Sequence, residues 1–537
     1  MYTITIYIKS YFLATSSTPL YNKNMKTAAD IIGQFNNATE ADKLLITTAY
    51  DFATKAHSGH IRYSGEPYMV HVSNVGLKLA EMGMGPRTVA AGLLHDTIED
   101  TPVTVEQIKT EFGDEILFLV EGVTKLSSVR YYGTDRHNES LRKLFVATSQ
   151  DIRVLIIKLN DRLHNMETLH HVPPEKQRRI ARETLEIYVP VAHRLGMGKI
   201  RKELEDLAFP YVYPEEFKRV TTLLDGRAGK TNELLERERK VLQKRLADAK
   251  LLDFNTSYRV KGLFSLYHKL SRKEWDINAV YDLLAIRVVV PTIEECYQTL
   301  GIIHQLWRPL PGRMKDYIAF PKPNGYKSIH TTVTTNHGTI MEIQIRTRQM
   351  HQESEFGIAS HLMYKPPVIS GPVASPGRFA NLIPSLFRPF SRTAVRSSLK
   401  DVDKGTDHKD RIPQWINQIS ELHTKDKSTG DEFMDEMRQD FFSNRIFVFT
   451  PIGDVVDLPV GATPIDFAYA IHSDIGDHIS GVKVNRKLVQ LDTVLRNGDI
   501  VEVENRKSAK PSKKWLDIAK TTLAKRHIKS ALEKQAI

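Results

Sequence analysis

The sequence contains almost no cysteine, since Cys296 is the only one among 537 residues. A disulfide framework and a cysteine-based zinc site are therefore excluded, and a reducing compartment such as the cytoplasm is expected. Long apolar runs are also missing, because no stretch reaches the roughly 18 residues that a membrane-spanning helix needs. We therefore expect neither a secreted disulfide-stabilised protein nor a membrane protein.

The composition is that of a soluble globular protein, with 41% hydrophobic and 26% charged residues. The length predicts several domains, since one domain usually takes about 100–200 residues. The net charge is +11, from 75 lysines and arginines against 64 acidic residues. A net positive charge favours anionic partners such as nucleotides or RNA, but it does not indicate which of these binds.

The first half of the chain has a helical pattern up to about Lys250. Apolar residues recur there at intervals of three and four residues, as at Leu45, Ala49 and Phe52. Its last part, Gly229–Lys250, is so highly charged that we expect a solvated connecting helix. Few convincing strands interrupt this half, which is therefore predicted to be all-α.

The pattern changes at Leu251. Tyr281–Pro291 contains a β-branched apolar run typical of a buried strand, and Ser328–Thr334 with Thr339–Arg346 predicts a hairpin. Pro366–Arg411 is rich in Pro, Ser, Gly and Arg, which is typical of a flexible linker. Arg445–Arg506 combines short strands with a helix that begins near Pro464, an order that predicts a small β-grasp module.

Three fragments of the helical half carry histidine and acidic residues: Arg62–His71, Gly92–Asp100 and Lys158–Asn165. Asp100 follows Asp96 by four residues, and Glu99 follows His95 by four, so one helix end would present all four groups. Imidazole and carboxylate without thiolate suit a hard or borderline cation such as Mn²⁺. A His-Asp pair alone is more often structural, but the three fragments on a helical background resemble the HD superfamily of metal phosphohydrolases.

A second cluster begins at Arg259–Lys269, which is dense in phosphate-binding side chains. Arg259 and Lys261 would share one face of a strand, and Ser265 and Lys269 one face of a helix. These cations and the hydroxyl group suit a triphosphate, although the spacing alone favours a solvated basic surface.

Two carboxylates change this balance. Asp282 opens an apolar strand, and Glu342 interrupts another, where Glu342, Gln344 and Arg346 would share one face. Carboxylates beside cations are the parts of a Mg²⁺-dependent phosphoryl-transfer site. Between them, Tyr326 could stack on a purine or be an ordinary loop residue.

Taken in order, these blocks resemble the RelA/SpoT family of (p)ppGpp synthetase/hydrolases over roughly Ala38–Lys525. The resemblance implies a multidomain chain with an all-α HD-type hydrolase domain, a mixed α/β nucleotidyltransferase-like synthetase domain and a small β-grasp TGS domain. The expected boundaries are 1–36 for a disordered leader, 37–200 for the hydrolase domain, 201–250 for a helical connector, 251–365 for the synthetase domain, 366–411 for the linker, 412–444 for a second helical connector, 445–506 for the TGS domain and 507–537 for a C-terminal helical segment.

The resemblance also implies roles for individual residues. In the hydrolase domain, the Mn²⁺ ligands would be His71, His95, Asp96 and Asp161, the water-activating pair Glu99 and Asp100, and the guanosine-nucleotide contacts Arg62 and Asn165. In the synthetase domain, Asp282 and Glu342 would bind Mg²⁺ and act in catalysis, and the nucleotide contacts would be Arg259, Lys261, Ser265, Lys269, Lys322, Asn324, Tyr326 and His330. The implied reactions are pyrophosphate transfer from ATP to the 3′-hydroxyl of GDP or GTP, and hydrolytic removal of that pyrophosphate.

The resemblance further implies partners and a subtype. His472 matches a TGS histidine that contacts uncharged tRNA, and the ribosome is a second expected partner. Arg313-Met314-Lys315-Asp316 matches the basic pattern of members with both activities. Tyr63 and Val72 depart from the family's usual lysine and proline, from which we expect altered nucleotide affinity. The given sequence ends soon after the TGS region, before the regulatory parts of long family members, so we expect incomplete control by the ribosome, whether the sequence is a fragment or the protein is naturally short.

Two alternatives remain open from the sequence. One is an enzyme in which either activity is weakened, and the other is a non-catalytic nucleotide- or tRNA-binding regulator. The complete sets of carboxylate and histidine ligands argue against both, because a pure binder needs none of these acids. The oligomeric state and the preference for GDP or GTP are left undetermined.

Overall fold

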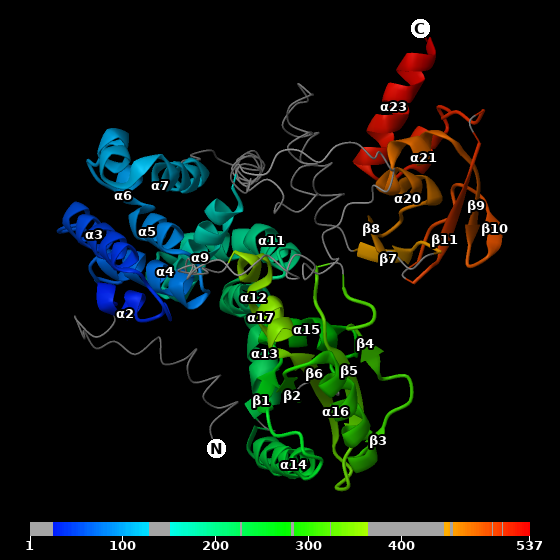
Figure 1. The fold of residues 1–537 in the computed structure, drawn as a ribbon, viewed down its shortest axis with the longest axis horizontal. Helices are drawn as coiled ribbons and strands as arrows, with labels where there is room; N and C mark the ends of the chain where they lie inside the picture. Colours follow the sequence, from blue (N-terminus) through cyan, green and yellow to red (C-terminus); the bar gives the residue numbers. More distant parts are fainter. Residues whose placement is uncertain are drawn as a thin grey trace, which may run out of the picture. The chain divides into compact units, whose positions relative to one another are not determined.

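The structure is a computed structural model that describes residues 25–127, 151–225, 228–280, 284–322, 324–362, 445–451, 455–496, 498–506 and 508–536. The chain divides into two compact units, one of residues 1–130 and 140–375 and the other of residues 131–139 and 376–537. Figure 1 shows the helical part of the first unit in blue and cyan, its sheet in green, and the second unit in orange and red. The expected linker 366–411, the connector 412–444 and Asp282 lie outside the described residues.

The first unit begins with helices, as the pattern predicted. They are α2 (Ala28–Ile32), α3 (Glu40–Ala56), α4 (Met69–Glu81), α5 (Pro86–Leu94), α6 (Thr97–Asp100), α7 (Val105–Ser127), α9 (Ile152–Glu167), α10 (Pro174–Glu183) and α11 (Val189–Arg194), with a short 3-10 helix, η2 (Leu169–His171), and a π-helix, η3 (Thr184–Tyr188). Thr39 starts α3 with a capping box to Asp42, which satisfies the free N–H groups at the helix start. Apolar stripes of α4, α5 and α9 are buried between them.

Part of the segment that the sequence assigned to a disordered leader is helical. Residues 1–24 lie outside the described part, but Ala28–Ile32 forms α2, which Thr27 caps through a reciprocal pair of hydrogen bonds with Asp30. Ile31 is fully buried. The expected disordered leader over 1–36 is therefore wrong for residues 28–32, because one apolar side chain and a capping box fix this turn to the helical domain.

Three further helices lead into the sheet: α12 (Gly198–Val212), α13 (Pro214–Asp225) and α14 (Ala228–Asp248). The prediction that the charged helix is a solvated connector is wrong. Leu235, Leu242 and Leu246 of α14 are buried in the same apolar cluster as the sheet residues Ile286 and Val288. Its charged face is wide, but a narrow leucine stripe is enough to pack the helix against the domain.

The sheet has six strands: β1 (Asn255–Val260), β2 (Leu284–Val290), β3 (Arg308–Pro309), β4 (Lys315–Asp316), β5 (Ile329–Thr334) and β6 (Ile340–Thr347). Its order is β1-β2-β6-β5-β3, with β4 also pairing with β5. Only the β2–β6 pair is parallel among the described pairs of this sheet, and β5–β6 is the predicted hairpin. The accompanying helices are α15 (Leu263–Ser271), α16 (Ile293–Leu306), α17 (Arg348–Phe356) and the turns η4 (Ile277–Ala279) and η5 (Gly357–His361).

The helical and mixed parts of the first unit meet at a tight backbone contact. Ile358 N donates to Leu195 O at 2.9 Å. Gly357 has a φ of +55°, and a Cβ atom there would lie 2.0 Å from Leu195 O. Helix α12 contacts both α15 and α17 in addition to α10 and α11 (Figure 1). The sequence therefore uses a glycine where two backbones approach too closely for any side chain.

The second unit contains β7 (Arg445–Phe449), β8 (Val455–Pro459), α20 (Pro464–Ile471), α21 (Ser473–Asp477), β9 (Ile479–Val484), β10 (Lys487–Val489), β11 (Val501–Asn505), α22 (Trp515–Ile518) and α23 (Thr522–Ala536). The hairpin β7–β8 joins the sheet β10-β9-β11 through a parallel bridge between Phe449 and Ile500. Phe467, Trp515 and Ile528 share one core, so the C-terminal helices pack on the small mixed module. No helix in the described ranges is long and apolar enough to cross a membrane.

Candidate functional sites

The first candidate site lies where α4, the end of α5 and α9 meet. Helix α4 carries His71, α9 carries Asp161, and α5 ends at Leu94, so that His95 and Asp96 form the junction to α6. The continuous helix implied by the fourfold spacing is therefore interrupted. The interruption turns the Asp96 carboxylate toward the histidines, while Glu99 and Asp100 lie exposed on α6.

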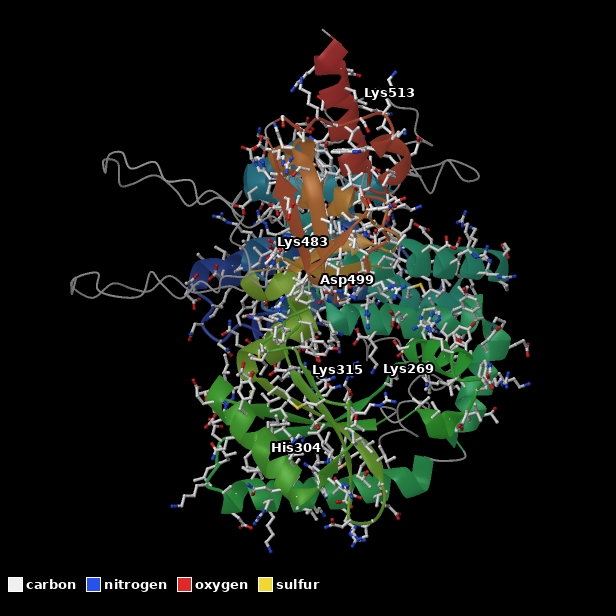
Figure 2. The ribbon with its side chains drawn as sticks, turned by 90° about the vertical axis from the view of Figure 1, so that its right-hand side faces the viewer. Lys269, His304, Lys315, Lys483, Asp499 and Lys513 are labelled. Atoms are coloured by element: carbon white, nitrogen blue, oxygen red, sulfur yellow. The ribbon has the colours of Figure 1, made fainter. Side chains whose placement is uncertain are left out.

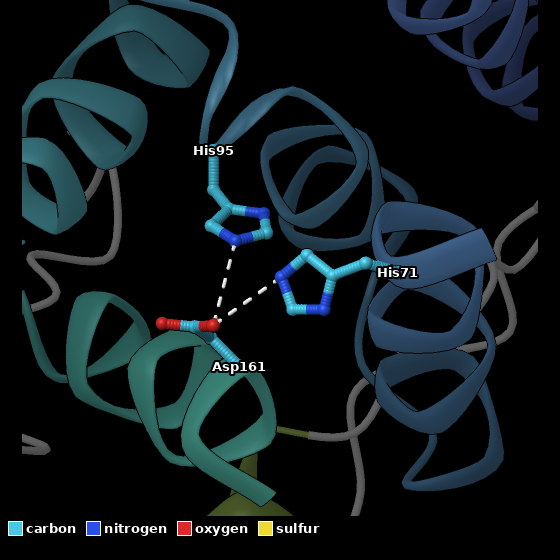
Figure 3. A group of neighbouring side chains, drawn as sticks. All are labelled: His71, His95 and Asp161. Atoms are coloured by element: carbon cyan, nitrogen blue, oxygen red, sulfur yellow. Dashed lines mark ion pairs between the residues drawn. The ribbon is translucent and has the colours of Figure 1, made fainter. Parts of the chain in front are cut away.

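The four expected ligand side chains converge. Asp96 Oδ2 lies 3.1 Å from His95 Nε2 and 3.5 Å from His71 Nε2. Asp161 Oδ1 lies 3.3 Å from His71 Nε2 and 3.8 Å from His95 Nε2, as Figure 3 shows. Ligand atoms of His71, His95 and Asp161 all lie within 4.8 Å of one another, and the three residues are buried. Two imidazoles and carboxylates at this spacing form a possible metal site.

Hydrogen bonds orient His95 toward this centre. Its Nδ1 lies 2.8 Å from the carbonyl oxygen of Gly92, which identifies Nδ1 as the donor and leaves Nε2 facing the carboxylates. A metal-binding histidine is usually held in this way through its second nitrogen. His95 Nε2 is buried and faces the carboxylate oxygens of Asp96 and Asp161, between which a cation could bind.

The charges of the cluster also favour a cation. Burial opposes protonation of His95, yet the carboxylates of Asp96 and Asp161 raise its pKa to about 10. The pKa of each carboxyl group lies well below its usual range, although burial opposes ionisation of both. For Asp96 the effect of burial is outweighed by His95. For Asp161 it is outweighed by Lys158 together with His71. The negative charges of the two buried carboxylates thus require compensation by a positive charge. A divalent cation could provide this charge in place of the proton that His95 otherwise holds.

Several neighbours of this site were not predicted from the sequence. Lys158 Nζ lies 2.7 Å from Asp161 Oδ2, His164 Nδ1 lies 2.9 Å from His71 Nδ1, and Tyr68 donates to Asp96 or Asp100. Only Lys158 had a readable signal, because it precedes Asp161 by one helical turn. The other two contacts join residues far apart in the chain.

Arg62 and Asn165 extend the cluster outward. Arg62 Nη2 donates to Asn165 Oδ1 at 2.5 Å, and Asn165 Nδ2 donates to Asp161 Oδ1 at 2.6 Å. Arg62 Nη1 also lies 3.1 Å from His164 Nδ1. The two predicted nucleotide contacts are thus brought next to each other, one of them directly on a candidate metal ligand. Tyr63 is exposed and lies near Lys176, whose Nζ is 5.8 Å from the ring centre.

The second candidate site is a cavity of about 1070 Å³. The predicted residues that line it are Arg259, Lys261, Ser265, Lys269, Lys322, Asn324, Tyr326, His330 and Glu342. Lys269 on α15 and Lys315 on β4 both face this cavity and are labelled in Figure 2. A concave site with convergent polar groups of this size suits a nucleotide.

Glu342, which is partly buried, lies at the centre of a polar network. Its Oε1 is 3.2 Å from His330 Nδ1, and its Oε2 accepts from Gln344 Nε2 at 2.7 Å. Arg346 donates to Gln344 Oε1 at 3.0 Å and to the Tyr326 hydroxyl at 3.2 Å. The predicted polar face of β6 is confirmed, because Glu342, Gln344 and Arg346 bond along one side of the strand.

Positive charge is crowded around this cavity. Burial, together with Lys315, Arg201 and Arg259, lowers the pKa of Lys322 to about 8. Burial and the neighbouring Arg346 lower the pKa of Arg287 to about 10. Cations whose charged forms are destabilised in this way gain from an anionic ligand, which would restore their ordinary pKa values.

One detail of the basic segment was predicted wrongly. Strand β1 ends at Val260, so Lys261 follows the strand and does not share its face with Arg259. Both side chains nevertheless line the cavity, because the turn at Gly262 directs the chain into α15. Ser265 and Lys269, which were predicted to share one face of a helix, also line it.

Helix α12 contributes two acidic residues that were not predicted from the sequence. Asp206 Oδ1 accepts from Phe264 N at 3.1 Å, and Glu205 Oε2 accepts from Ser265 Oγ at 3.2 Å. Gly262 cannot cap α15 with a side chain, so the buried Asp206 takes this role from a neighbouring helix. The start of α15 is thereby fixed to the helical part of the unit.

In the second unit, His472 is exposed and lies between two helices. It ends α20 and begins α21, where its Nδ1 accepts from Asp474 N at 3.1 Å. His472 therefore does end the helix Pro464–Ile471, whatever further role it has. Its Nε2 edge is not engaged in this cap.

The two sites and the three folds define a class: multidomain proteins that join a helical HD domain to a mixed α/β domain and a small TGS module. Residues 49–198 match the HD domain, residues 258–367 match the region found in RelA / SpoT proteins, and residues 446–504 match the TGS domain. Their order along the chain is the order that the sequence predicted.

Similar curated proteins agree with this class. A guanosine-3′,5′-bis(diphosphate) 3′-pyrophosphohydrolase from Aquifex aeolicus is 40% identical over 518 residues, which are 94% of this chain and 68% of that protein. The chain therefore belongs to the RelA/SpoT family, as the motifs indicated.

Two other relatives carry different names. A GTP pyrophosphokinase from Streptomyces coelicolor is 44% identical over 91% of this chain and 56% of its own length. The bifunctional (p)ppGpp synthase/hydrolase SpoT of Escherichia coli is 39% identical over 90% of this chain and 64% of its own length. The chain thus spans about three fifths of the length of these two relatives.

Proposed function

We propose that the protein is a bifunctional alarmone enzyme. One site would transfer the β,γ-pyrophosphate of ATP to the 3′-hydroxyl of GDP or GTP, giving (p)ppGpp and AMP. The other would hydrolyse (p)ppGpp to GDP or GTP and pyrophosphate. The observation that carries this proposal is the presence of two chemically different sites in one unit: a buried His/Asp cluster and a cationic cavity around Glu342.

For hydrolysis, we assign a divalent cation, Mn²⁺ by the family resemblance, to His71, His95, Asp96 and Asp161. A bound cation supplies Lewis acidity toward water and a phosphoryl oxygen. Glu99 and Asp100, exposed on α6 beside this cluster, would orient the attacking water and accept its proton. Arg62 and Asn165 would hold the guanosine nucleotide at the cluster's outer edge, where their hydrogen bonds already connect them to Asp161.

For synthesis, we assign the triphosphate to the basic segment. Arg259, Lys261 and Lys269 would neutralise its charge, and the Ser265 hydroxyl would donate to it after release from Glu205. Tyr326 would stack on the guanine, and Lys322, Asn324 and His330 would complete that subsite.

For catalysis of synthesis, we assign Glu342 as one catalytic carboxylate. The second is Asp282, which is assigned from the sequence alone. Glu342 would hold Mg²⁺ and receive the proton of the 3′-hydroxyl group. Phosphoryl transfer of this kind depends mainly on positioning and charge neutralisation, for which a rigid polar network suits well. The Glu342–Gln344–Arg346 hydrogen bonds give that rigidity.

For the second unit we propose binding of uncharged tRNA, and through it the ribosome, with His472 among the contacts. The support is the TGS match and the exposed histidine edge. Cytoplasmic action follows from these partners.

The test is a pair of assays on one purified sample. Labelled ATP with GDP and Mg²⁺ should give ppGpp and AMP, and ppGpp with Mn²⁺ should give GDP and pyrophosphate. A protein that binds the nucleotides but converts none of them would instead be the non-catalytic regulator. One active site and one silent site would mean an enzyme with a weakened second activity.

A further inference from the structure

The Tyr68 hydroxyl connects the two functional parts of the His/Asp cluster. It lies 2.8 Å from Asp96 Oδ2 and 2.7 Å from Asp100 Oδ2. Asp96 belongs to the candidate metal ligands, and Asp100 to the pair that we assign to water activation. One phenol oxygen thus contacts both carboxylates, although they come from opposite ends of the four-residue helix α6.

Asp100 needs such a contact. It is exposed at the end of a single helical turn, where its backbone N–H bonds to Asp96 O at 2.9 Å. That bond fixes the backbone but leaves the carboxylate free to rotate. A phenol has a single hydrogen to donate. If Asp96 held a cation, the single hydrogen of Tyr68 would be best directed at Asp100.

The tyrosine ring is itself held in place. It stacks on the ring of His57, with centroids 4.7 Å apart and planes 15° apart, and the Arg62 guanidinium carbon lies 5.7 Å from its centre. His57 is 3% exposed, and neither of its ring nitrogens makes a hydrogen bond. Burial lowers the pKa of His57 to about 4, so this histidine is a neutral packing surface at physiological pH. The backbone of Tyr68 is fixed by a 2.9 Å hydrogen bond from its N–H to His60 O.

We propose that Tyr68 is a positioning residue for hydrolysis, which sets the Asp100 carboxylate at a fixed place relative to the metal ligand Asp96. This inference rests on the proposed hydrolase function. We distinguish this role from substrate binding, because the hydroxyl contacts two carboxylates and one face of the ring lies against His57. It predicts an effect on the rate of the chemical step and little effect on nucleotide affinity.

The test compares Tyr68→Phe with the parent and with Tyr50→Phe. Tyr68→Phe removes one oxygen and keeps the stacked ring, so the fold should survive. Tyr50 on α3 is a matched control, since it too lies near carboxylates, those of Asp51 and Asp30, which are outside the cluster. For each protein, kcat and KM of ppGpp hydrolysis are measured at saturating Mn²⁺, Mn²⁺ affinity by electron paramagnetic resonance, and ppGpp synthesis as a check of folding.

We expect Tyr68→Phe to lower kcat by roughly 10–100-fold, the usual effect of removing a supporting partner at a metal site. KM and synthesis should not change, and bound Mn²⁺ should still be detected. A kcat equal to that of Tyr50→Phe, or a raised KM with unchanged kcat, would overturn the inference and leave the hydrolase function intact. A parent that binds Mn²⁺ but leaves ppGpp intact would overturn the proposed function itself, and the inference with it.

Discussion

Lys158 Nζ lies 2.7 Å from Asp161 Oδ2 on the same face of α9, and both side chains are buried. This contact occupies one oxygen of Asp161 and leaves Oδ1 for His71 and Asn165. A buried ion pair contributes little net stability, but removing one partner leaves an uncompensated charge. Lys158 therefore couples the ligand set to the stability of the helical domain.

The first prediction uses that coupling. Asp161→Asn should lower ppGpp hydrolysis by at least about 100-fold, because a ligand charge is lost. It should also destabilise the protein, by up to about 3–5 kcal/mol, since the buried Lys158 loses the charge of its ion-pair partner. Thermal unfolding and both activity assays measure these effects. The double variant Lys158→Met, Asp161→Asn should recover stability without hydrolysis; recovery of hydrolysis would contradict the ligand role.

The second prediction concerns Glu342. Glu342→Gln keeps the size of the side chain and removes its charge, so synthesis should fall by at least about 100-fold while hydrolysis persists. Extra Mg²⁺ should not restore it. Glu238→Gln is the matched control, because Glu238 also pairs with a histidine, His337, at 3.0 Å, lies outside the cavity and is more deeply buried than Glu342. Equal loss in both variants would indicate a general folding effect.

The third prediction is a pH dependence of GDP binding. The pKa of Lys322 is lowered to about 8, mainly by burial, so its charged form is present below that pH and is lost as the pH rises through it. The KM for GDP should therefore rise between pH 7 and pH 9. In Lys322→Arg the cation stays charged over this range, and the rise should be much smaller. Parallel KM profiles in the two proteins would exclude Lys322 as the titrating group.

The fourth prediction separates the two roles of His472. We expect weak, salt-dependent tRNA binding, which decreases in His472→Ala. Because His472 also caps α21, alanine removes a cap worth about 1 kcal/mol. His472→Asn keeps a capping side chain and removes the ring. A gel-shift titration should show reduced tRNA affinity in both variants; normal affinity in His472→Asn would assign the residue to the cap alone.

The sequence predicted much of the fold because local patterns carried it. The hairpin β5–β6, the helix that starts at Pro464 and the convergence of the candidate ligands His71, His95, Asp96 and Asp161 were all predicted from spacing, from turn residues or from the family resemblance. The leucine stripe of α14 was missed, because charged residues dominate that helix.

Long-range contacts were beyond sequence patterns. Nothing in the spacing indicates that Tyr68 meets Asp100, 32 residues later, or that Asp206 caps a helix 58 residues further on. Such contacts depend on how the helices pack, which no single segment encodes. The family motif identified the basic segment but not the helix α12 that supports it.

The last prediction concerns Gly357, where the two parts of the first unit meet. A Cβ atom at this position would lie 2.0 Å from Leu195 O and 2.7 Å from Met197 N, and the backbone φ is +55°. Both partners are backbone atoms, so no side-chain rotation relieves the clash, and one part must move away from the other. Gly357→Ala should therefore destabilise the unit by more than about 4 kcal/mol and impair both activities. Gly338→Ala is the matched control, because Gly338 has a φ of +75° with no atom within 4 Å of the added Cβ. It should cost only about 1–2 kcal/mol, the cost of the left-handed conformation. The two variants are compared by denaturant unfolding and by both activity assays. Equal losses of stability would show that the backbone at Leu195 can move away from the added Cβ at no energetic cost.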